Sequence, residues 1–152
     1  MKSAEEILYE KGTKIISVTG QTPIDNAIRT MLENKIGAII IEEDGDLIGI
    51  WTERDLMRNI SIDKVDTGSA PIKDHMTKDI ISAPHDDTVY NLMDKFLGKR
   101  LRHLLIEKNG KYLGLLSIGD VIKATLQEKT DELNDLKTMV SWDYYEDWKW
   151  SK

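Results

Sequence analysis

The sequence predicts an α/β protein in which a β-α-β-β-α unit occurs twice, followed by an extended C-terminal helix. The first observation is a repeated motif that runs from Gly49 to Asp55 and again, 65 positions later, from Gly114 to Asp120. The second is that the same offset relates residues 16–58 to residues 81–123 without a gap. Chance does not keep turn glycines and apolar positions together in one register, so the chain contains a duplicated small domain.

A short helix is expected before the first unit. Ser3 and Glu6 have the spacing of a capping box, and Gly12 is a favourable residue just after a helix end. These signals predict a helix over residues 4–11, within an N-terminal segment 1–11 that packs against the body of the protein.

The first unit is predicted over residues 12–65. Its strands are expected at residues 15–18, 36–41 and 47–51, and the pair Asp44-Gly45 is typical of a hairpin turn. Thr22 is the expected N-cap of its first helix, with Pro23 at the first helical position. The inward-facing residues of that helix are expected to be Ile24, Ala27, Ile28, Met31 and Leu32.

The second unit is predicted over residues 75–128, after a linker without periodicity. Asp87 is the expected N-cap of its first helix, and Asn109-Gly110 is a strong signal for a type I′ turn. The inward-facing residues of this helix are expected to be Val89, Leu92, Met93, Phe96 and Leu97.

The last helix is expected to begin at Gly119 and to continue into the segment 129–152. That segment also holds an aromatic tail with three of the four Trp residues. The continuation is predicted from an apolar seam at near-heptad spacing, formed by Ile122, Leu126, Leu133, Leu136 and Val140.

Composition narrows the class of protein. The net charge of −6 argues against nucleic acid or an anionic membrane as the main partner. The absence of Cys excludes disulfides, thiolate metal sites and Cys nucleophiles. No apolar run is long enough to span a bilayer, and the first residues lack a signal-peptide core, so a cytoplasmic location is expected.

No catalytic triad, metal cluster or paired-carboxylate site is evident, and we do not expect an enzyme.

The repeated motif joins a strand to a helix start. Thr52 and Ser117 lie at N-cap positions, and Asp55 and Asp120 follow three residues later, which is a capping box with Asp in place of Glu. The exposed N–H groups of a helix start favour phosphate, and a carboxylate can accept hydrogen bonds from both hydroxyls of a ribose. These residues therefore either cap the helices only or also bind a ligand.

Two such units in tandem, each ending in Gly-x-x-Ser/Thr-x-x-Asp, resemble a pair of cystathionine-β-synthase-type (CBS) domains, or Bateman module. The segment 52–55 resembles the frequent Ser/Thr-Glu-Arg-Asp form, and residues 72–81 resemble the family's usual approach to its second domain. The segment 102–106 resembles an Arg-His-Leu-Pro-Val strand, with Leu105 where Pro is usual. The resemblance covers roughly residues 7–127 and is greatest to stand-alone two-domain members.

The resemblance implies a pseudo-twofold pair of domains that acts as a regulatory module. Such modules bind adenosine-containing ligands such as AMP, ADP, ATP, NAD or S-adenosylmethionine in clefts between the domains. Thr52 and Ser117 would then contact phosphate or ribose, and Asp55 and Asp120 the ribose hydroxyls. Arg54 would be the phosphate cation of the first copy.

The two sites cannot be equivalent, because the counterpart of Arg54 is Gly119. Arg102 and His103 instead add charge in the second copy; each is otherwise a surface charge. The segments leading into the first strand of each unit would flank the adenine, or else are ordinary buried strand. Their expected ligand contacts are Lys14, Ile15, Ile16, Thr77, Asp79, Ile80 and Ile81.

We expect a homodimer, because a single helix cannot bury the C-terminal seam alone. The downstream protein partner is unknown from the sequence. The alternative to nucleotide sensing is a dimerisation or protein-interaction module whose nucleotide sites are degenerate.

Overall fold

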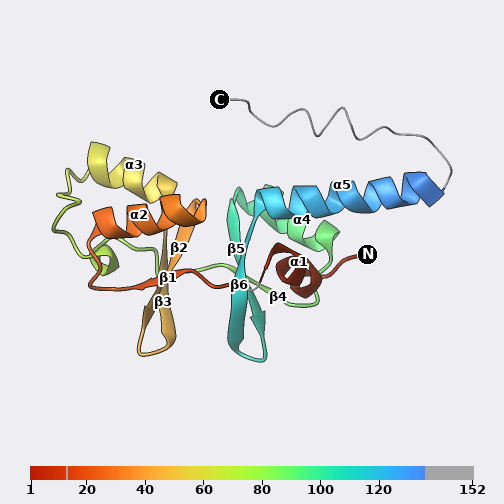
Figure 1. The fold of residues 1–152 in the computed structure, drawn as a ribbon, viewed down its shortest axis with the longest axis horizontal. Helices are drawn as coiled ribbons and strands as arrows, with labels where there is room; N and C mark the ends of the chain where they lie inside the picture. The colour runs from red at the N-terminus through yellow and green to blue at the C-terminus, as the bar shows by residue number, and fades with distance from the viewer. Residues whose placement is uncertain (13, 136–152) are drawn as a thin grey trace.

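The computed structural model describes residues 1–12 and 14–135 and contains both predicted units (Figure 1). Helix α1 (Ala4–Lys11) comes first, and a 3-10 turn, η1 (Ile72–Asp74), lies in the linker. The first unit consists of β1 (Ser17–Thr19), α2 (Ile24–Asn34), β2 (Ala38–Glu43), β3 (Asp46–Thr52) and α3 (Glu53–Ser61). The second unit consists of β4 (Ser82–Pro84), α4 (Val89–Lys99), β5 (His103–Lys108), β6 (Lys111–Ser117) and α5 (Ile118–Asp135). The predicted fold class and element order are confirmed.

Each unit forms a three-stranded sheet. The first strand is parallel to the second, and the second is antiparallel to the third. Ser17 pairs with Ile40 in the first sheet, and the second sheet repeats this pairing 65 positions later. Both residues of the turns Asp44-Gly45 and Asn109-Gly110 have positive φ, as a type I′ turn requires. The two sheets lie next to each other in the middle of the molecule (Figure 1).

Each unit has its own apolar core. Trp51 is the largest fully buried side chain of the first core, and its indole Nε1–H donates to Asn59 Oδ1 at 3.0 Å. The core of the second unit is extended by α1, which contributes Ala4, Ile7 and Leu8. The N-terminal helix is therefore a structural part of the second unit, although it precedes the first in the sequence.

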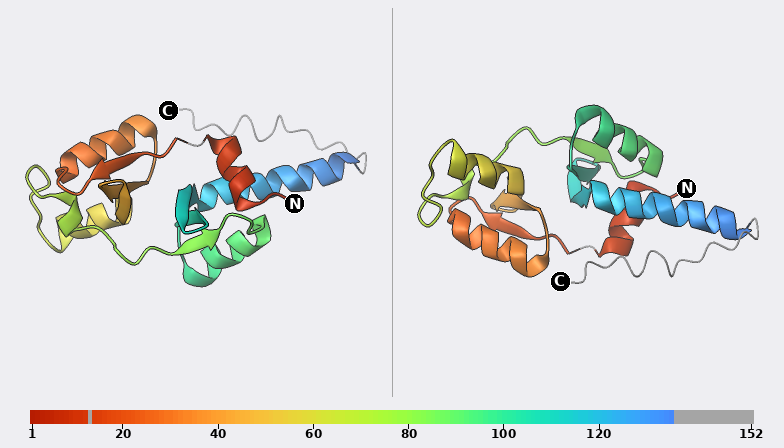
Figure 2. Two further views of the ribbon diagram at one scale, coloured as in Figure 1. Left: turned by 90° about the horizontal axis from the view of Figure 1, so that it is seen from below. Right: turned by 90° about the horizontal axis from the view of Figure 1, so that it is seen from above.

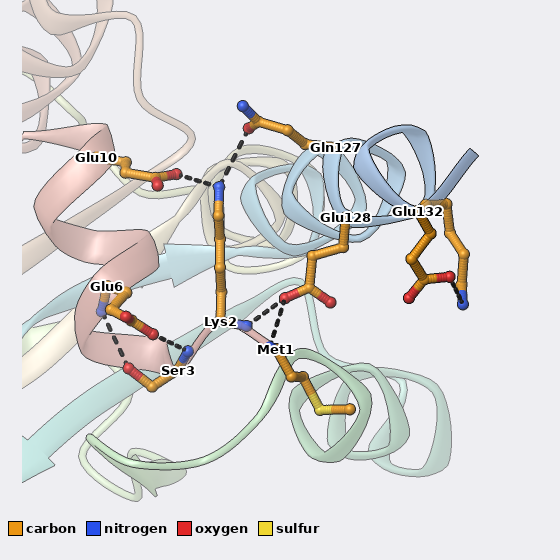
Figure 3. A network of polar contacts seen from close by, with 9 residues as sticks. Met1, Lys2, Ser3, Glu6, Glu10, Gln127, Glu128 and Glu132 are labelled. Atoms are coloured by element: carbon orange, nitrogen blue, oxygen red, sulfur yellow. Dashed lines mark hydrogen bonds and ion pairs between the residues drawn. The ribbon is translucent and has the colours of Figure 1, made fainter. Parts of the chain in front are cut away.

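Polar contacts hold α1 in this position. The predicted capping box between Ser3 and Glu6 is present. The backbone N–H of Lys2 donates to the Glu128 carboxylate on α5, and Lys2 Nζ donates to Glu10 Oε2 at 2.8 Å and to Gln127 Oε1 at 3.3 Å (Figure 3). Helix α1 thus crosses α5 and is fixed to it (Figure 2).

The start of α2 differs from the prediction. The helix begins at Ile24, the N-cap is Pro23, and no side chain caps it, so the assignment of Thr22 was wrong. Linker carbonyls satisfy the first N–H groups instead: Ile24 donates to Ala70 O at 3.1 Å and Asp25 to Thr67 O at 2.9 Å. This contact replaces a side-chain cap because the linker folds back onto the helix start.

The cap of α4 was also misassigned. Thr88 is the N-cap, and its hydroxyl accepts from the Asn91 N–H at 3.3 Å. Asp87, the predicted cap, forms an ion pair with Lys95 and accepts from Asn91 Nδ2 at 3.4 Å. The Asp87 carboxylate therefore contacts the side chains of Asn91 and Lys95, one and two turns into α4, and does not cap the backbone.

Two predicted core residues are exposed. Leu32 is 73% exposed and Leu97 is 65% exposed, so the prediction that they face inward was wrong. They occupy equivalent positions of the repeat, at the edge of the apolar stripes on α2 and α4. The sheet covers the centre of each stripe and leaves this edge in solvent.

Helix α5 continues past the second unit, as predicted, and reaches Asp135. Ile122, Leu126 and Leu133 of the seam are exposed on it, and Thr130 is buried with its hydroxyl donating to Leu126 O at 2.8 Å. Leu136, Val140 and the aromatic tail lie outside the described residues. Among the described helices, none combines the length and apolar content of a membrane span.

Candidate functional site

The repeated motif forms a capping box at both helix starts. At α3, the Thr52 hydroxyl accepts from the Asp55 N–H at 3.3 Å, and Asp55 Oδ2 accepts from the Thr52 N–H at 2.9 Å. At α5, the Ser117 hydroxyl accepts from the Asp120 N–H at 3.1 Å, and Asp120 Oδ2 accepts from the Ser117 N–H at 2.7 Å. Capping uses only Oδ2, and Oδ1 of each Asp has no hydrogen-bond partner among the described residues. Each carboxylate therefore keeps an acceptor for a ligand.

Two clefts open at these helix starts, and each takes residues from both units. The cleft at α5, the Ser117 cleft, has a volume of about 270 Å³. The cleft at α3, the Thr52 cleft, has a volume of about 220 Å³. Gly37, His103 and Leu115 line both, so the two clefts share a wall.

All of the predicted site residues line one cleft or the other. The Ser117 cleft contains Lys14, Ile15, Ile16, His103, Ser117 and Asp120. The Thr52 cleft contains Thr52, Arg54, Asp55, Thr77, Asp79, Ile80, Ile81, Arg102 and His103. The helix start of each unit thus faces the segment that leads into the first strand of the other unit. That these residues bind a nucleotide stays a prediction.

The motif glycines allow other parts of the chain to approach the sheet closely. A Cβ atom on Gly49 would lie 2.3 Å from Met76 Sδ, and one on Gly114 would lie 3.1 Å from Leu8 Cδ2. The segment that leads into β4 occupies this place in the first unit, and α1 occupies it in the second. A side chain at either position would push that segment away from its cleft.

The strand edges at the two clefts are used differently. In the Thr52 cleft, Ile50 and Thr77 exchange two backbone hydrogen bonds, of 3.0 and 2.8 Å. Leu115 is the counterpart of Ile50, and its carbonyl accepts from Lys11 Nζ at 3.1 Å. A side chain from α1 therefore takes the place of a backbone pairing.

Lys11 is a cleft residue that the sequence analysis missed. Its Nζ also forms an ion pair with Asp120 Oδ2 at 2.8 Å. The sequence places Lys11 at the end of the first predicted helix, but no local signal shows where that helix packs. Only the tertiary contacts of α1 bring the ammonium group to Asp120.

The environment of the Ser117 cleft shifts two pKa values. Burial raises the pKa of Asp120, but hydrogen bonds from Lys11 and from the Ser117 backbone N–H outweigh it, so this pKa lies below its ordinary value. The pKa of His103 is lowered by burial, and the nearby Lys11 cation adds to this effect. Asp120 is thus an anion at neutral pH, and His103 is held toward its neutral form.

Each cleft also has a cation on a left-handed backbone. Lys35, after α2, has φ of 54° and lines the Ser117 cleft; Arg100, after α4, has φ of 52° and lines the Thr52 cleft. A residue with a Cβ in this conformation costs roughly 1 kcal/mol relative to glycine. The repeat register could have revealed the pair, because both units have a basic residue where glycine is the usual choice.

The CBS domain family model matches the chain twice, at residues 6–62 and 72–127. An uncharacterised 17.7 kDa protein of Acidianus ambivalens is 33% identical over 78% of this chain and 71% of its own length. The mitochondrial CBS domain-containing protein CBSX3 of Arabidopsis thaliana is 30% identical over 88% of this chain and 66% of its own length. This chain thus spans just under two thirds of that relative.

Solved structures show the same arrangement. A CBS-domain-containing protein of Agrobacterium tumefaciens is 34% identical, with a TM-score of 0.76 over 82% of this chain and 99% of that one. A CBS domain protein of Pyrobaculum aerophilum, solved as a complex with AMP, has a TM-score of 0.71 over 84% of this chain and 97% of that one, at 20% identity. The paired repeats, their two clefts and these matches show that the chain belongs to the CBS-domain family.

Proposed function

We propose that this chain is a regulatory module that senses adenine nucleotides, such as AMP, ADP, ATP or NAD, in the Ser117 and Thr52 clefts. The observation that carries the proposal is the same in both clefts. A helix start with an Asp whose Oδ1 is unoccupied faces an apolar segment from the other unit. The AMP complexes of the Pyrobaculum protein and of CBSX2, which share this fold, support the choice of ligand.

The roles of the residues follow from their chemistry. Asp55 and Asp120 would accept from the ribose hydroxyls through Oδ1, which capping leaves available. Thr52 and Ser117 begin helices whose positive dipole ends favour phosphate. Among the remaining cleft residues, those that would enclose the adenine are apolar: Ile15, Ile16, Ile80 and Ile81.

Ligand binding would change how the two units pack. Each cleft takes its helix start from one unit and its apolar wall from the other, so a nucleotide contacts both. A ligand that binds one relative arrangement of the units more tightly shifts the population toward it. A change of this kind, rather than a chemical step, is the regulatory output that we propose.

We propose further that the chain forms a homodimer through the outer face of its helices. Leu32 and Leu97 are exposed at equivalent repeat positions, and so are Met57 and Ile122. These four residues belong to α2, α4, α3 and α5, which lie on the same side of the molecule, toward the top in Figure 1. A second copy would cover this apolar face, and a different protein partner is the alternative occupant.

Isothermal titration calorimetry with AMP, ADP, ATP and NAD tests the proposal, with GMP as the control for base recognition. We expect binding of at least one adenine ligand. Affinity should fall at one cleft in Asp55→Asn and at the other in Asp120→Asn, and at both clefts in the double variant, because an amide oxygen is a weaker acceptor than a carboxylate. Asp46→Asn, at an exposed carboxylate outside both clefts, is the matched control. A double variant that binds as tightly as the parent chain would refute the proposed sites, and no heat with any adenine ligand would favour a ligand-free interaction module.

A further inference from the structure

The two clefts differ in the charge that they present. The Ser117 cleft contains three lysines, Lys11, Lys14 and Lys35, and a single carboxylate, Asp120. Three ammonium groups against one carboxylate make positive charge predominate in this cleft, whether or not His103 is protonated.

The Thr52 cleft is balanced by comparison. It contains three arginines and three carboxylates, namely Arg54, Arg100, Arg102, Glu53, Asp55 and Asp79. Its Asp55 accepts hydrogen bonds from the N–H and the hydroxyl of Thr52 and forms no ion pair with a cation among the described residues.

Lys11 is the residue that makes the clefts most different. It reaches the Ser117 cleft because α1 is fixed to the second unit: the Ala4 N–H donates to Asp87 O at 2.8 Å, and Leu8 packs against Gly114. These contacts leave the last turn of α1 beside Asp120. The position of Lys11 is therefore fixed by the packing of α1 against the second unit.

We infer that Lys11 makes the Ser117 cleft selective for di- and triphosphate nucleotides, whereas the Thr52 cleft takes the monophosphate about as well. This inference rests on the proposed function. A ribose held at Asp120 carries its phosphates on the same sugar, so an ammonium group 2.8 Å from that carboxylate is within reach of the phosphate chain. Each further phosphate adds negative charge beside three lysines, and lysine is a common point-charge partner of phosphate.

A nucleotide can bind in the Ser117 cleft without breaking the contact between Lys11 and Asp120. Asp120 Oδ1 is available to the ribose, while Lys11 holds Oδ2. When phosphate is present, the flexible four-carbon stem of Lys11 allows its ammonium to contact phosphate and carboxylate together. The ion pair of the free protein thus keeps the cation in place until the ligand arrives.

Methyl NMR separates the two clefts in one experiment. Ile15 and Ile16 report on the Ser117 cleft, and Ile50 and Ile80 report on the Thr52 cleft. Titrations with AMP, ADP and ATP should show ATP binding about tenfold or more tightly than AMP in the Ser117 cleft, and within about threefold of AMP in the other. The preference should shrink as salt is added, because exposed charges are screened.

The matched variants are Lys11→Gln and Lys111→Gln, the latter at an exposed lysine of β6 outside both clefts. Lys11→Gln should reduce the preference for ATP over AMP to about threefold or less, and Lys111→Gln should leave it unchanged. Equal affinities in the Ser117 cleft, an unchanged preference in Lys11→Gln, or shifts confined to the Thr52 cleft would overturn this inference alone. If no nucleotide shifts either set of methyl groups, the proposed function fails and the inference fails with it.

Discussion

Lys11 Nζ lies 2.8 Å from Asp120 Oδ2, which joins the end of the N-terminal helix to the helix start of the second unit across 109 positions of sequence. The same carboxylate oxygen caps α5 by accepting from the Ser117 N–H. Asp120 therefore has a structural role and, in our proposal, a ligand-binding role. The two roles use different oxygen atoms and can be separated by experiment.

Asp120→Ala should weaken nucleotide binding in the Ser117 cleft more than it weakens the fold. Loss of a helix cap costs roughly 1 kcal/mol of unfolding free energy. Loss of the ribose acceptor and of the partner of Lys11 should lower affinity by about tenfold or more. Urea denaturation and calorimetry measure the two effects on one sample. A variant that melts much earlier but binds normally would show that Asp120 is only a cap.

Lys35→Gly and Arg100→Gly should each weaken nucleotide binding without lowering the stability of the fold. Glycine adopts the left-handed conformation at the end of α2 or α4 without the strain of a Cβ, so the free energy of unfolding should stay the same or rise by up to about 1 kcal/mol. Affinity for nucleotide should fall, because each substitution removes a cation from one cleft. Lys64→Gly, another position with positive φ but outside both clefts, is the control. Unchanged binding in both cleft variants would make these cations structural only.

Ile7→Ala should destabilise the second unit by about 2–4 kcal/mol. Ile7 is 4% exposed and packs in the core that α1 shares with the sheet of that unit. Tyr9→Ala on the same helix is the control, because Tyr9 is 78% exposed and should change stability by less than about 0.5 kcal/mol. Thermal and urea unfolding provide the comparison. Equal effects of the two substitutions would mean that α1 does not belong to this core in solution.

His103 should make the protein less stable as pH falls below about 6.5. Burial holds the pKa of His103 below its ordinary value in the folded state, so the unfolded chain binds the proton more readily over this range. The free energy of unfolding therefore decreases with falling pH until the folded-state pKa is passed. In His103→Gln this part of the pH dependence should disappear. Urea unfolding at a series of pH values between about 5 and 8, roughly the range in which histidine titrates, measures it. His75→Gln, at a histidine outside both clefts, is the control and shows how much another histidine contributes to the pH dependence of the unfolding free energy. If His103→Gln leaves this pH dependence unchanged, the prediction is wrong.

Leu97→Ser should shift the chain from dimer toward monomer while leaving its fold intact. Leu97 is exposed on the face that we propose for the second copy, so a polar replacement removes apolar contact area from the interface and nothing from the core. Light scattering measures the mass, and Tyr9→Ser provides an exposed apolar control on α1. Removal of residues 136–152 tests separately whether the aromatic tail contributes. An unchanged mass in Leu97→Ser would place the interface elsewhere.

The sequence by itself determined the two units, their strand and helix order, the hairpin turns and the residues around each motif. These features follow from local rules: positive φ at Asp44-Gly45 and Asn109-Gly110, capping by Thr52 and Ser117, and a register repeated at one fixed offset. The caps of α2 and α4 and the exposure of Leu32 and Leu97 were predicted wrongly. A distant segment, or its absence, decided two of these outcomes: the linker covers the start of α2, and no part of the sheet covers the two leucines. At α4 the cap is one residue further along, because Thr88 caps the helix and Asp87 instead contacts Asn91 and Lys95.

Only the tertiary structure decided which segments meet in each cleft. It placed α1 in the core of the second unit and brought Lys11 to Asp120. It also grouped Arg102 with Arg54 in the Thr52 cleft, whereas the three lysines line the Ser117 cleft. Local sequence cannot specify such contacts, because they depend on which apolar face a helix buries when several faces are available. Helix α1 buries Ala4, Ile7 and Leu8, with Leu8 in the space left by Gly114, and this packing places the Lys11 ammonium beside Asp120.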